Sequence, residues 1–217
     1  MNIDNNSLIR VRDPNRTWII SDTHFGHDKI RDYAQRPFED MHSMDEYMVD
    51  RWNENVRNNL DIVYHLGDFC FGKAKDAARY FERLNGKICI LTLLWHHDNS
   101  WMHNMTEVRS KSGDKVTFLQ PTVVLVMPSG FYQVNGHPRS MFLSHYPNYI
   151  WHHKHYLSWH VYGHSHDAKQ VIPGSPLAMN VNVEATHMNY GPISIADIGK
   201  RLSRIEQNLG LKPAGIR

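Results

Sequence analysis

The sequence predicts an α/β fold whose second half is rich in strands. In the first half, short apolar runs alternate with amphipathic stretches, and this alternation is typical of parallel βαβ units. From Pro121 onward, apolar runs follow one another with little helical pattern between them. A length of 217 residues is enough for one domain with a substantial core, and we expect residues 1–217 to form a single domain.

The first half is predicted to alternate strands with helices. The runs 17–20, 62–66 and 87–91 predict strands, because they are short and apolar and polar turn residues follow them. Ser43 and Glu46 have the spacing of a capping box, which predicts the start of a helix. The apolar positions of this helix are Met44, Tyr47, Met48, Trp52, Val56 and Leu60, and those of the next helix are Ala74, Ala77, Ala78, Phe81 and Leu84.

The second half is predicted to consist mainly of strands. A hairpin is expected from the runs 121–127 and 131–134, because a Pro-Ser-Gly turn separates them. Further predicted elements are strands at 141–144, 159–162 and 180–183 and a closing helix within 193–209. Gly199 interrupts the pattern of this helix and leaves its start open.

The composition excludes several classes of protein. Apolar residues make up 41% and charged residues 21%, which is close to the average globular protein and argues against disorder. No apolar run approaches the ~20 residues that span a bilayer, and the first residues lack an export signal. A formal net charge of +2 does not indicate a nucleic-acid binder. We therefore expect a cytoplasmic protein with no membrane association, no obligate protein partner, and Cys70 and Cys89 as buried free thiols.

The 16 histidines are the unusual feature of the composition, and their positions indicate a metal centre. Five apolar runs each end in, or lead shortly into, a segment that contains Asp or His. These segments are Asp22-Thr23-His24, Gly67-Asp68, His96-His97-Asp98, His145 and His164-Ser165-His166. Ligands bind at the carboxyl ends of strands in open α/β sheets, so the five segments can meet in space. One such histidine alone is more often an ordinary loop residue, but five similar strand ends favour a metal site.

The residue types and their spacing indicate which metals such a site would bind. Carboxylate and imidazole ligands together suit Mn, Fe, Co, Ni and Zn. The spacing of Asp22 and His24 places two side chains on the same side of an extended segment. Gly67 and Gly163 each directly precede a candidate ligand, where a sharp turn or a close approach of the backbone requires glycine.

The ordered set of five motifs resembles the calcineurin-like metallophosphoesterase superfamily. The pattern of that superfamily is Asp-x-His, Gly-Asp, Gly-Asn-His followed by Asp or Glu, a single His, and Gly-His-x-His. This chain contains the pattern in the same order between about Trp18 and His166. The flanking stretches 21–27 and 144–147 are similar to those of the small bacterial and phage phosphoesterases within the superfamily.

The resemblance implies two facing mixed β-sheets flanked by helices, with two divalent metal ions (Mn, Zn, Co, Ni or Fe) as cofactors. By this resemblance one ion would be bound by Asp22, His24, Asp68 and His166, and the other by Asp68, His145, His164 and His96. Asp68 would bridge the two ions, and His97 would face the substrate.

The third motif departs from the superfamily pattern. Trp95 and His96 stand where the superfamily has glycine and asparagine. An imidazole at position 96 shifts the expected metal preference toward Zn, Co or Ni. If the glycine of the superfamily occupies a strained backbone position, a bulky residue there costs on the order of 1–3 kcal/mol. We therefore expect a displaced loop, an altered metal preference and weaker catalysis.

The expected reaction is hydrolysis of a phosphodiester in a nucleotide or a nucleic-acid fragment. Two ions roughly 3.5–4 Å apart would hold a bridging hydroxide, which attacks phosphorus in line. His97 is the candidate for stabilising the transition state or protonating the leaving oxygen, with Asp98 orienting it. The alternative interpretation of His97 is a loop histidine that does not touch the substrate.

Two further residues are candidates for substrate binding. His27 would lie near the site, although a structural hydrogen bond explains a histidine there equally well. Arg36 is a candidate contact for a phosphate, although a solvated loop arginine is the commoner role. The aromatic and basic stretch 148–156 fits either a lip that stacks a base or a packed helix with exposed histidines.

Two alternatives to a phosphodiesterase stay open. A phosphomonoesterase uses the same ligands, so the sequence does not separate the two activities. A metal-binding scaffold of the same fold with weakened catalysis is favoured by the change at Trp95 and His96. It is opposed by the retention of every other ligand position of the superfamily pattern.

Overall fold

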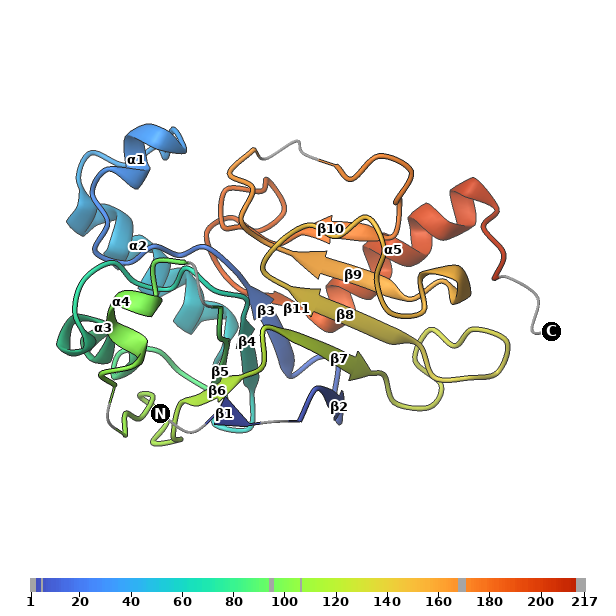
Figure 1. The fold of residues 1–217 in the computed structure, drawn as a ribbon, viewed down its shortest axis with the longest axis horizontal. Coiled ribbons are helices and arrows are strands. Elements are labelled where there is room, and N and C mark those ends of the chain that lie inside the picture. The colour runs from blue at the N-terminus through green and yellow to red at the C-terminus, as the bar shows by residue number, and fades with distance from the viewer. Residues whose placement is uncertain (1–2, 5, 94–95, 106, 168–170, 214–217) are drawn as a thin grey trace.

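Two mixed β-sheets flanked by helices make up the computed structural model (Figure 1). It describes residues 3–4, 6–93, 96–105, 107–167 and 171–213. The architecture confirms the predicted α/β class and the two mixed sheets. Within these residues, no helix is both long enough and apolar enough to cross a bilayer.

The first sheet contains the three strands predicted in the first half of the chain. Its order is β1 (Ile3–Asp4), β6 (Thr117–Leu119), β5 (Lys87–Leu91), β4 (Ile62–His65), β3 (Thr17–Ile20) and β11 (Ile193–Ser194). All neighbours are parallel except β11, which runs antiparallel to β3. The strands β1, β6 and β11 are absent from the sequence prediction, because two or three residues are too short to show a period.

The second sheet shows that the predicted hairpin is wrong. Its order is β10 (Ala178–Asn180), β9 (Trp159–Tyr162), β8 (Ser140–Ser144), β7 (Thr122–Val126) and β2 (Leu8–Arg10). The antiparallel partner of β7 is β8, and the stretch 131–134 forms no strand. Tyr132 has a φ of 45°, in the left-handed region, so the chain cannot stay extended there. The predicted strand at 180–183 ends at Asn180.

Helices cover the outside of the sheets. They are α1 (Ile30–Tyr33), α2 (Met41–Asn55), α3 (Ala74–Phe81), α4 (Asn99–Met102), η1 (Lys154–Tyr156, a 3₁₀ turn) and α5 (Ile195–Leu209). Figure 1 shows α1 to α4 grouped at the side of the first sheet, whereas α5 lies beside the second sheet. The predicted apolar face of α2 is buried through Met44, Met48 and Trp52. Leu60 lies beyond the end of this helix and is exposed.

The capping box of α2 begins one turn earlier than predicted. Asp40 is the N-cap residue, and its side chain accepts a hydrogen bond from the Ser43 backbone N–H at 2.7 Å. The Ser43 hydroxyl is the reciprocal acceptor for the Asp40 backbone N–H. Ser43 is therefore the third helical residue rather than the cap, and Glu46 instead forms an ion pair with Arg83 at 2.6 Å.

Close packing explains the glycine inside α5. A Cβ atom on Gly199 would stand 2.5 Å from Tyr132 Cε2 and 3.1 Å from Trp159 Cη2. The helix can approach β9 only because this side chain is missing, and the packing gain offsets the low helix propensity of glycine. Cys70 and Cys89 are buried free thiols, as predicted.

The two sheets meet where the predicted metal ligands lie. Ser21, just after β3, forms a bridge to Asn182, just after β10. The Ser21 backbone N–H also donates to the Val181 carbonyl at 3.1 Å. The ends of strands from both sheets thus face the same region.

Candidate metal centre

The structure brings all seven predicted metal ligands together. Backbone hydrogen bonds join the loops that carry them: Asp22 N–H donates to the Gly67 carbonyl at 3.1 Å, and His24 N–H donates to the Asp68 carbonyl at 3.0 Å. The loop after β9 is tied to the same place, since His164 N–H donates to Asp22 Oδ2 at 2.9 Å.

The first group of potential ligands consists of Asp22, His24 and His166. One ligand atom from each of these side chains lies within 4.8 Å of the others. Asp22 Oδ1 is 4.0 Å from both His24 Nε2 and His166 Nε2. Asp22 and His24 both have left-handed backbone conformations, with φ of 59° and 50°. The two side chains therefore converge by local backbone twisting, and the predicted extended segment is wrong.

The second group consists of Asp68, His145 and His164, whose ligand atoms also lie within 4.8 Å of one another. Asp68 and His164 again have left-handed conformations, with φ of 55° and 65°. A non-glycine residue in this region costs on the order of 1–3 kcal/mol, and such strain persists where the surrounding structure holds it for a function.

Asp68 connects the two groups. Its Oδ1 accepts a hydrogen bond from the His97 backbone N–H at 3.0 Å, which fixes the orientation of the carboxylate. Its Oδ2 lies 3.6 Å from His24 Nε2 in the first group and 3.7 Å from His145 Nε2 in the second. The same oxygen atom therefore faces ligands of both groups.

Several buried polar atoms at this place have no hydrogen-bond partner. They are Asp22 Oδ1 and both ring nitrogens of His24 and of His145. A buried polar atom without a partner costs about 1–3 kcal/mol, so natural proteins rarely leave several together. Divalent cations of the borderline kind would satisfy them, because carboxylate and imidazole are the ligands that these ions prefer.

The protonation states of His24 and His145 also suit cation binding. Burial lowers the pKa of His145 to about 4 and the pKa of His24 well below its usual value, so both rings are neutral at pH 7. Burial and the neighbouring Asp68 raise the pKa of Asp22 to about 7. Burial opposes ionisation of Asp68 as well, but its hydrogen bond with His96 and the nearby histidines hold its pKa below the usual range. A cation would favour the ionised form of both carboxylates.

His96 lies at the edge of this arrangement. Its Nδ1 is 3.3 Å from both Asp68 Oδ1 and Asp98 Oδ2, and its Nε2 lies 3.0 Å from the Leu93 backbone nitrogen. Burial opposes protonation of this ring, but the two carboxylates overcome burial and raise its pKa to about 9. His96 thus contacts the shared carboxylate, and its binding to the second ion stays a prediction. Trp95 lies outside the described residues, so its expected strain is not tested.

The predicted role of Asp98 is wrong. Its carboxylate is fully buried and accepts hydrogen bonds from the backbone N–H groups of Phe69 and Cys70 at 2.9 and 3.0 Å. It also accepts a hydrogen bond from Trp101 Nε1 at 3.2 Å. Asp98 therefore holds the loop after Asp68 rather than orienting His97.

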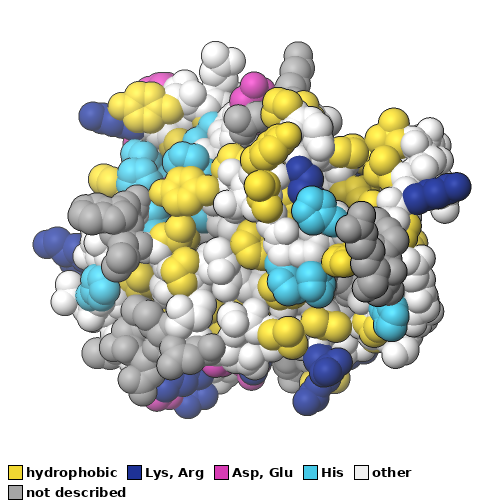
Figure 2. All heavy atoms as spheres, turned by 45° about the vertical axis from the view of Figure 1, so that its right-hand side comes forward, with side chains coloured by type: hydrophobic (Ala, Val, Ile, Leu, Met, Phe, Trp, Pro, Cys, Tyr) yellow, Lys and Arg dark blue, Asp and Glu magenta, His cyan; other side chains and the backbone are white. Residues whose placement is uncertain are grey.

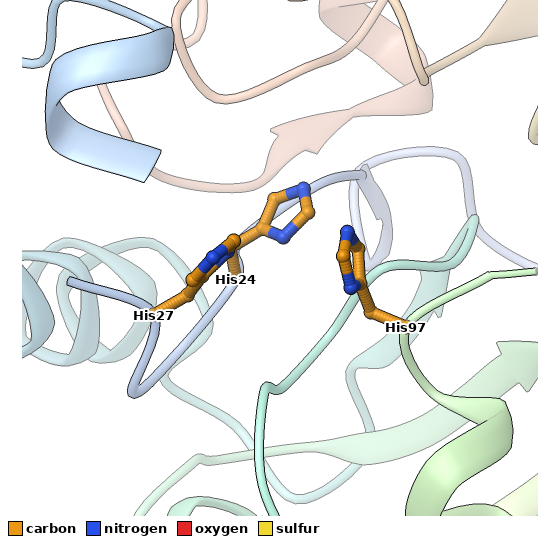
Figure 3. A group of neighbouring side chains, drawn as sticks. All are labelled: His24, His27 and His97. Atoms are coloured by element: carbon orange, nitrogen blue, oxygen red, sulfur yellow. The ribbon is translucent and has the colours of Figure 1, made fainter. Parts of the chain in front are cut away.

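His27 and His97 form an open cluster with His24. The three rings lie next to one another at tilted or edge-on angles, with centroids 5.1 to 5.5 Å apart (Figure 3). His97 is exposed and His27 is half-buried, so this side of the first group is open to solvent. His27 Nδ1 is buried without a hydrogen-bond partner, which argues against the structural role for that atom. The His27 ring stacks on Phe71 at 4.5 Å.

Comparison with known proteins places the chain in a family. It is 30% identical over 199 residues to the uncharacterized protein MJ1445 of Methanocaldococcus jannaschii, and the match covers 87% of this chain and 92% of that protein. This chain belongs to the same family as MJ1445. No family model matches it. The fold is similar to that of AQ665, a protein of unknown function from Aquifex aeolicus, with a TM-score of 0.52, 20% identity, and coverage of 85% of this chain and 97% of that one.

Arg36 is not exposed to solvent, and its guanidinium group is not available to bind a phosphate. Its side chain is fully buried, and Nε forms an ion pair with Glu184 Oε1 at 2.6 Å. The other two guanidinium nitrogens donate to the backbone carbonyls of Asp22 and Thr23 at 2.7 and 2.8 Å. The sequence prediction missed Glu184, because it lies 148 residues from its partner and in no motif.

Exposed aromatic side chains border the site on two sides. Tyr146 is 38% exposed, and its ring lies 4.6 Å from that of His164. Phe71 is 49% exposed and lies beside His27. Figure 2 shows histidine side chains at several places on this face, and the group at the upper left has apolar side chains next to it.

The stretch 148–156 is not a packed helix, because only Lys154–Tyr156 is helical, in a single 3₁₀ turn. The Lys154 ammonium lies over the rings of Tyr149 and Trp151, at 4.4 and 4.6 Å from their centroids. It also donates to the Tyr149 carbonyl and to Ser175 Oγ at 2.7 Å each. The basic group of this stretch is therefore engaged locally, and a role as a lip for a base stays a prediction.

Proposed function

We propose that this chain is a dinuclear metal-dependent phosphoesterase that hydrolyses phosphodiesters. The observation that carries the proposal is the position of Asp68 Oδ2, between His24 Nε2 at 3.6 Å and His145 Nε2 at 3.7 Å. One carboxylate oxygen thereby lies next to both ligand groups. Such sharing suits a pair of cations at the ~3.5–4 Å spacing used in phosphoryl transfer.

The residues divide naturally between two cations. Asp22, His24, Asp68 and His166 would hold one, and Asp68, His145, His164 and His96 would hold the other. Bound divalent cations would lower the pKa of a water and offset the negative charge that develops on the phosphoryl oxygens. The neutral rings of His24 and His145 are in the protonation state that a ligand needs.

His97 and His27 are the side chains placed to touch a substrate. Both stand at the open side of the first group, and the backbone of His97 is fixed to Asp68 Oδ1. We propose that the His97 ring donates a proton or a hydrogen bond to the leaving oxygen, which is worth about 10²- to 10⁴-fold in rate. His27 would position the phosphate group beside it.

Two features favour a diester over a monoester. A phosphomonoester dianion needs more cationic contacts than a diester monoanion, and Arg36 is committed to Glu184 and two carbonyls. The exposed rings of Tyr146 and Phe71 border the site on either side and can stack on the groups that a diester carries. A nucleotide or a short nucleic-acid fragment fits this description.

The test is hydrolysis after removal and replacement of metal. The protein is stripped with a chelator, and Mn, Zn, Co, Ni and Mg are added back separately before assay on bis-p-nitrophenyl phosphate and p-nitrophenyl phosphate. We expect hydrolysis to return with the borderline metals and to be faster on the diester. Asp68→Asn, checked for unchanged secondary structure, is the control and is expected to stay inactive.

The possible results separate the alternatives. Faster turnover of p-nitrophenyl phosphate would establish the phosphomonoesterase instead. Tight binding of metal without turnover of either compound or of a dinucleotide would contradict the enzyme and support the metal-binding scaffold.

A further inference from the structure

Glu184 lies outside the proposed ligand set but contacts one member of it. Its side chain is 6% exposed, and Oε1 lies 3.2 Å from His166 Nδ1 and 2.6 Å from Arg36 Nε. The Glu184 backbone N–H donates to Asn182 Oδ1 at 3.2 Å, which fixes the loop after β10. A buried carboxylate therefore stands directly behind the His166 ring, on the side away from Asp22.

This contact determines which nitrogen of His166 carries the proton. A carboxylate only accepts hydrogen bonds, so Nδ1 must be the donor. The Asn182 amide nitrogen also lies 3.3 Å from Nδ1 and would favour the opposite tautomer. The charge-assisted hydrogen bond with Glu184 outweighs this neutral contact. The free lone pair is then on Nε2, the nitrogen that faces Asp22 Oδ1 at 4.0 Å.

Arg36 extends the contact to the other side of the same ligand group. Its buried guanidinium donates to the carbonyls of Asp22 and Thr23, which belong to the left-handed segment that carries the first two ligands. Glu184 balances its charge. The Arg36–Glu184 ion pair thus holds the backbone segment that carries Asp22 and His24 and also holds the ring of His166.

In the second ligand group, His96 has a similar contact with the buried Asp98 carboxylate at 3.3 Å. The rings of His145 and His164 have no such carboxylate behind them in the part of the chain that the structure describes. Both ring nitrogens of His145 are buried without a hydrogen-bond partner. The ring of His164 is exposed and contacts the rings of His145 and Tyr146. The orientation of these two rings therefore depends on packing rather than on a fixed hydrogen bond.

We propose that Arg36 and Glu184 are positioning residues that preorganise the first cation site. This inference rests on the proposed dinuclear centre but not on its hydrolytic activity. Carboxylate groups that orient a metal-binding histidine typically change metal affinity 10- to 100-fold. We expect that effect at the first site alone.

The experiment measures the affinities of the two cation sites separately. The protein is first made metal-free with a chelator and is then titrated with Zn²⁺ and with Co²⁺ in the absence of substrate. The variants are Glu184→Ala and Glu184→Gln. The matched control is Glu206→Ala, because Glu206 forms a second arginine–glutamate pair with the buried Arg139 at 3.0 Å. We expect Glu184→Ala to weaken one of the two sites about 10- to 100-fold, Glu184→Gln to weaken the same site less, and Glu206→Ala to change neither affinity.

Equal weakening of both sites by Glu184→Ala, or no change at either, would overturn the proposal. If Glu184→Ala does not fold, ¹⁵N chemical shifts of His166 in the Zn-loaded wild-type protein decide the question. A protonated Nδ1 with Zn²⁺ on Nε2 supports the proposal, and the opposite tautomer refutes it. Binding of two cations, with Glu184→Ala weakening one site only, but no hydrolysis would refute only the proposed function. A wild-type protein that binds no cation would refute both.

Discussion

Gly163 packs against the Asp22 carboxylate so closely that a Cβ atom on Gly163 would overlap Asp22 Oδ2. The same Cβ would overlap Ser21 Oγ. The His164 N–H, one residue further on, donates to that Asp22 oxygen. The missing side chain thus allows a loop of the second sheet to reach a candidate ligand carried by the first sheet.

Gly163→Ala is therefore expected to disturb the metal centre. The added methyl group must displace Asp22 or the loop after β9, and overpacking of this kind costs typically about 1–3 kcal/mol. We expect lower stability in urea together with weaker cation binding. Gly199→Ala is the matched control, since its Cβ would meet Tyr132 away from the metal centre. The control should lose stability and keep its cation affinity, and a similar loss of affinity in both variants would contradict the argument.

Cations are expected to stabilise the folded protein. Several buried atoms of Asp22, His24 and His145 lack hydrogen-bond partners, and a bound ion would satisfy them. A ligand at about 100 times its dissociation constant stabilises by about 2.7 kcal/mol. Scanning calorimetry should show Tm rising with Zn²⁺ or Mn²⁺ and falling on chelation. The control is Asp68→Asn, whose Tm should not change when Zn²⁺ or Mn²⁺ is added.

Replacement of His97 should separate catalysis from metal binding. His97→Gln removes a ring that faces the open side of the first ligand group but leaves the backbone N–H that donates to Asp68. We expect kcat on bis-p-nitrophenyl phosphate to fall about 10²- to 10⁴-fold, with two cations still bound. Unchanged kcat would show that His97 is an ordinary loop histidine. Loss of bound metal would assign it a structural role instead.

His160 is expected to make stability depend on pH. Its Nε2 accepts a hydrogen bond from the Asn148 N–H at 3.0 Å, and burial lowers its pKa from 6.5 to about 4. The unfolded chain therefore takes up a proton below pH 6.5 that the folded protein does not. Stability should fall as the pH drops from 6.5 to 4, by up to about 3 kcal/mol at 1.36 kcal/mol for each pKa unit.

The measurement is urea unfolding of the metal-free protein between pH 7 and 4. His160→Phe should show a shallower decline than the wild-type protein over this range. The remaining decline has other sources, since burial also lowers the pKa of His65 to about 3. Equal slopes in the two proteins would mean that His160 titrates normally in the folded state.

The sequence alone determined the parts of this protein that depend on local pattern. The strands β3, β4, β5, β8 and β9 follow from short apolar runs, and each is followed by at least one of the seven candidate ligands. The meeting of these ligands was predictable because the carboxyl ends of strands lie together in such sheets. The proposed division between two ions comes from the resemblance carried by the five motifs.

Only the tertiary structure decided which residues far apart in the sequence contact one another. Hydrogen-bond partners far apart in sequence turn Asp98 toward the loop after β4 and engage Arg36 with Glu184. The partner of β7 was likewise settled by a left-handed turn at Tyr132 and its packing under Gly199. The hydrogen-bond partners of a side chain are selected from the groups that the folded chain brings near it. A local sequence pattern does not contain this information, because those groups lie far apart in the sequence.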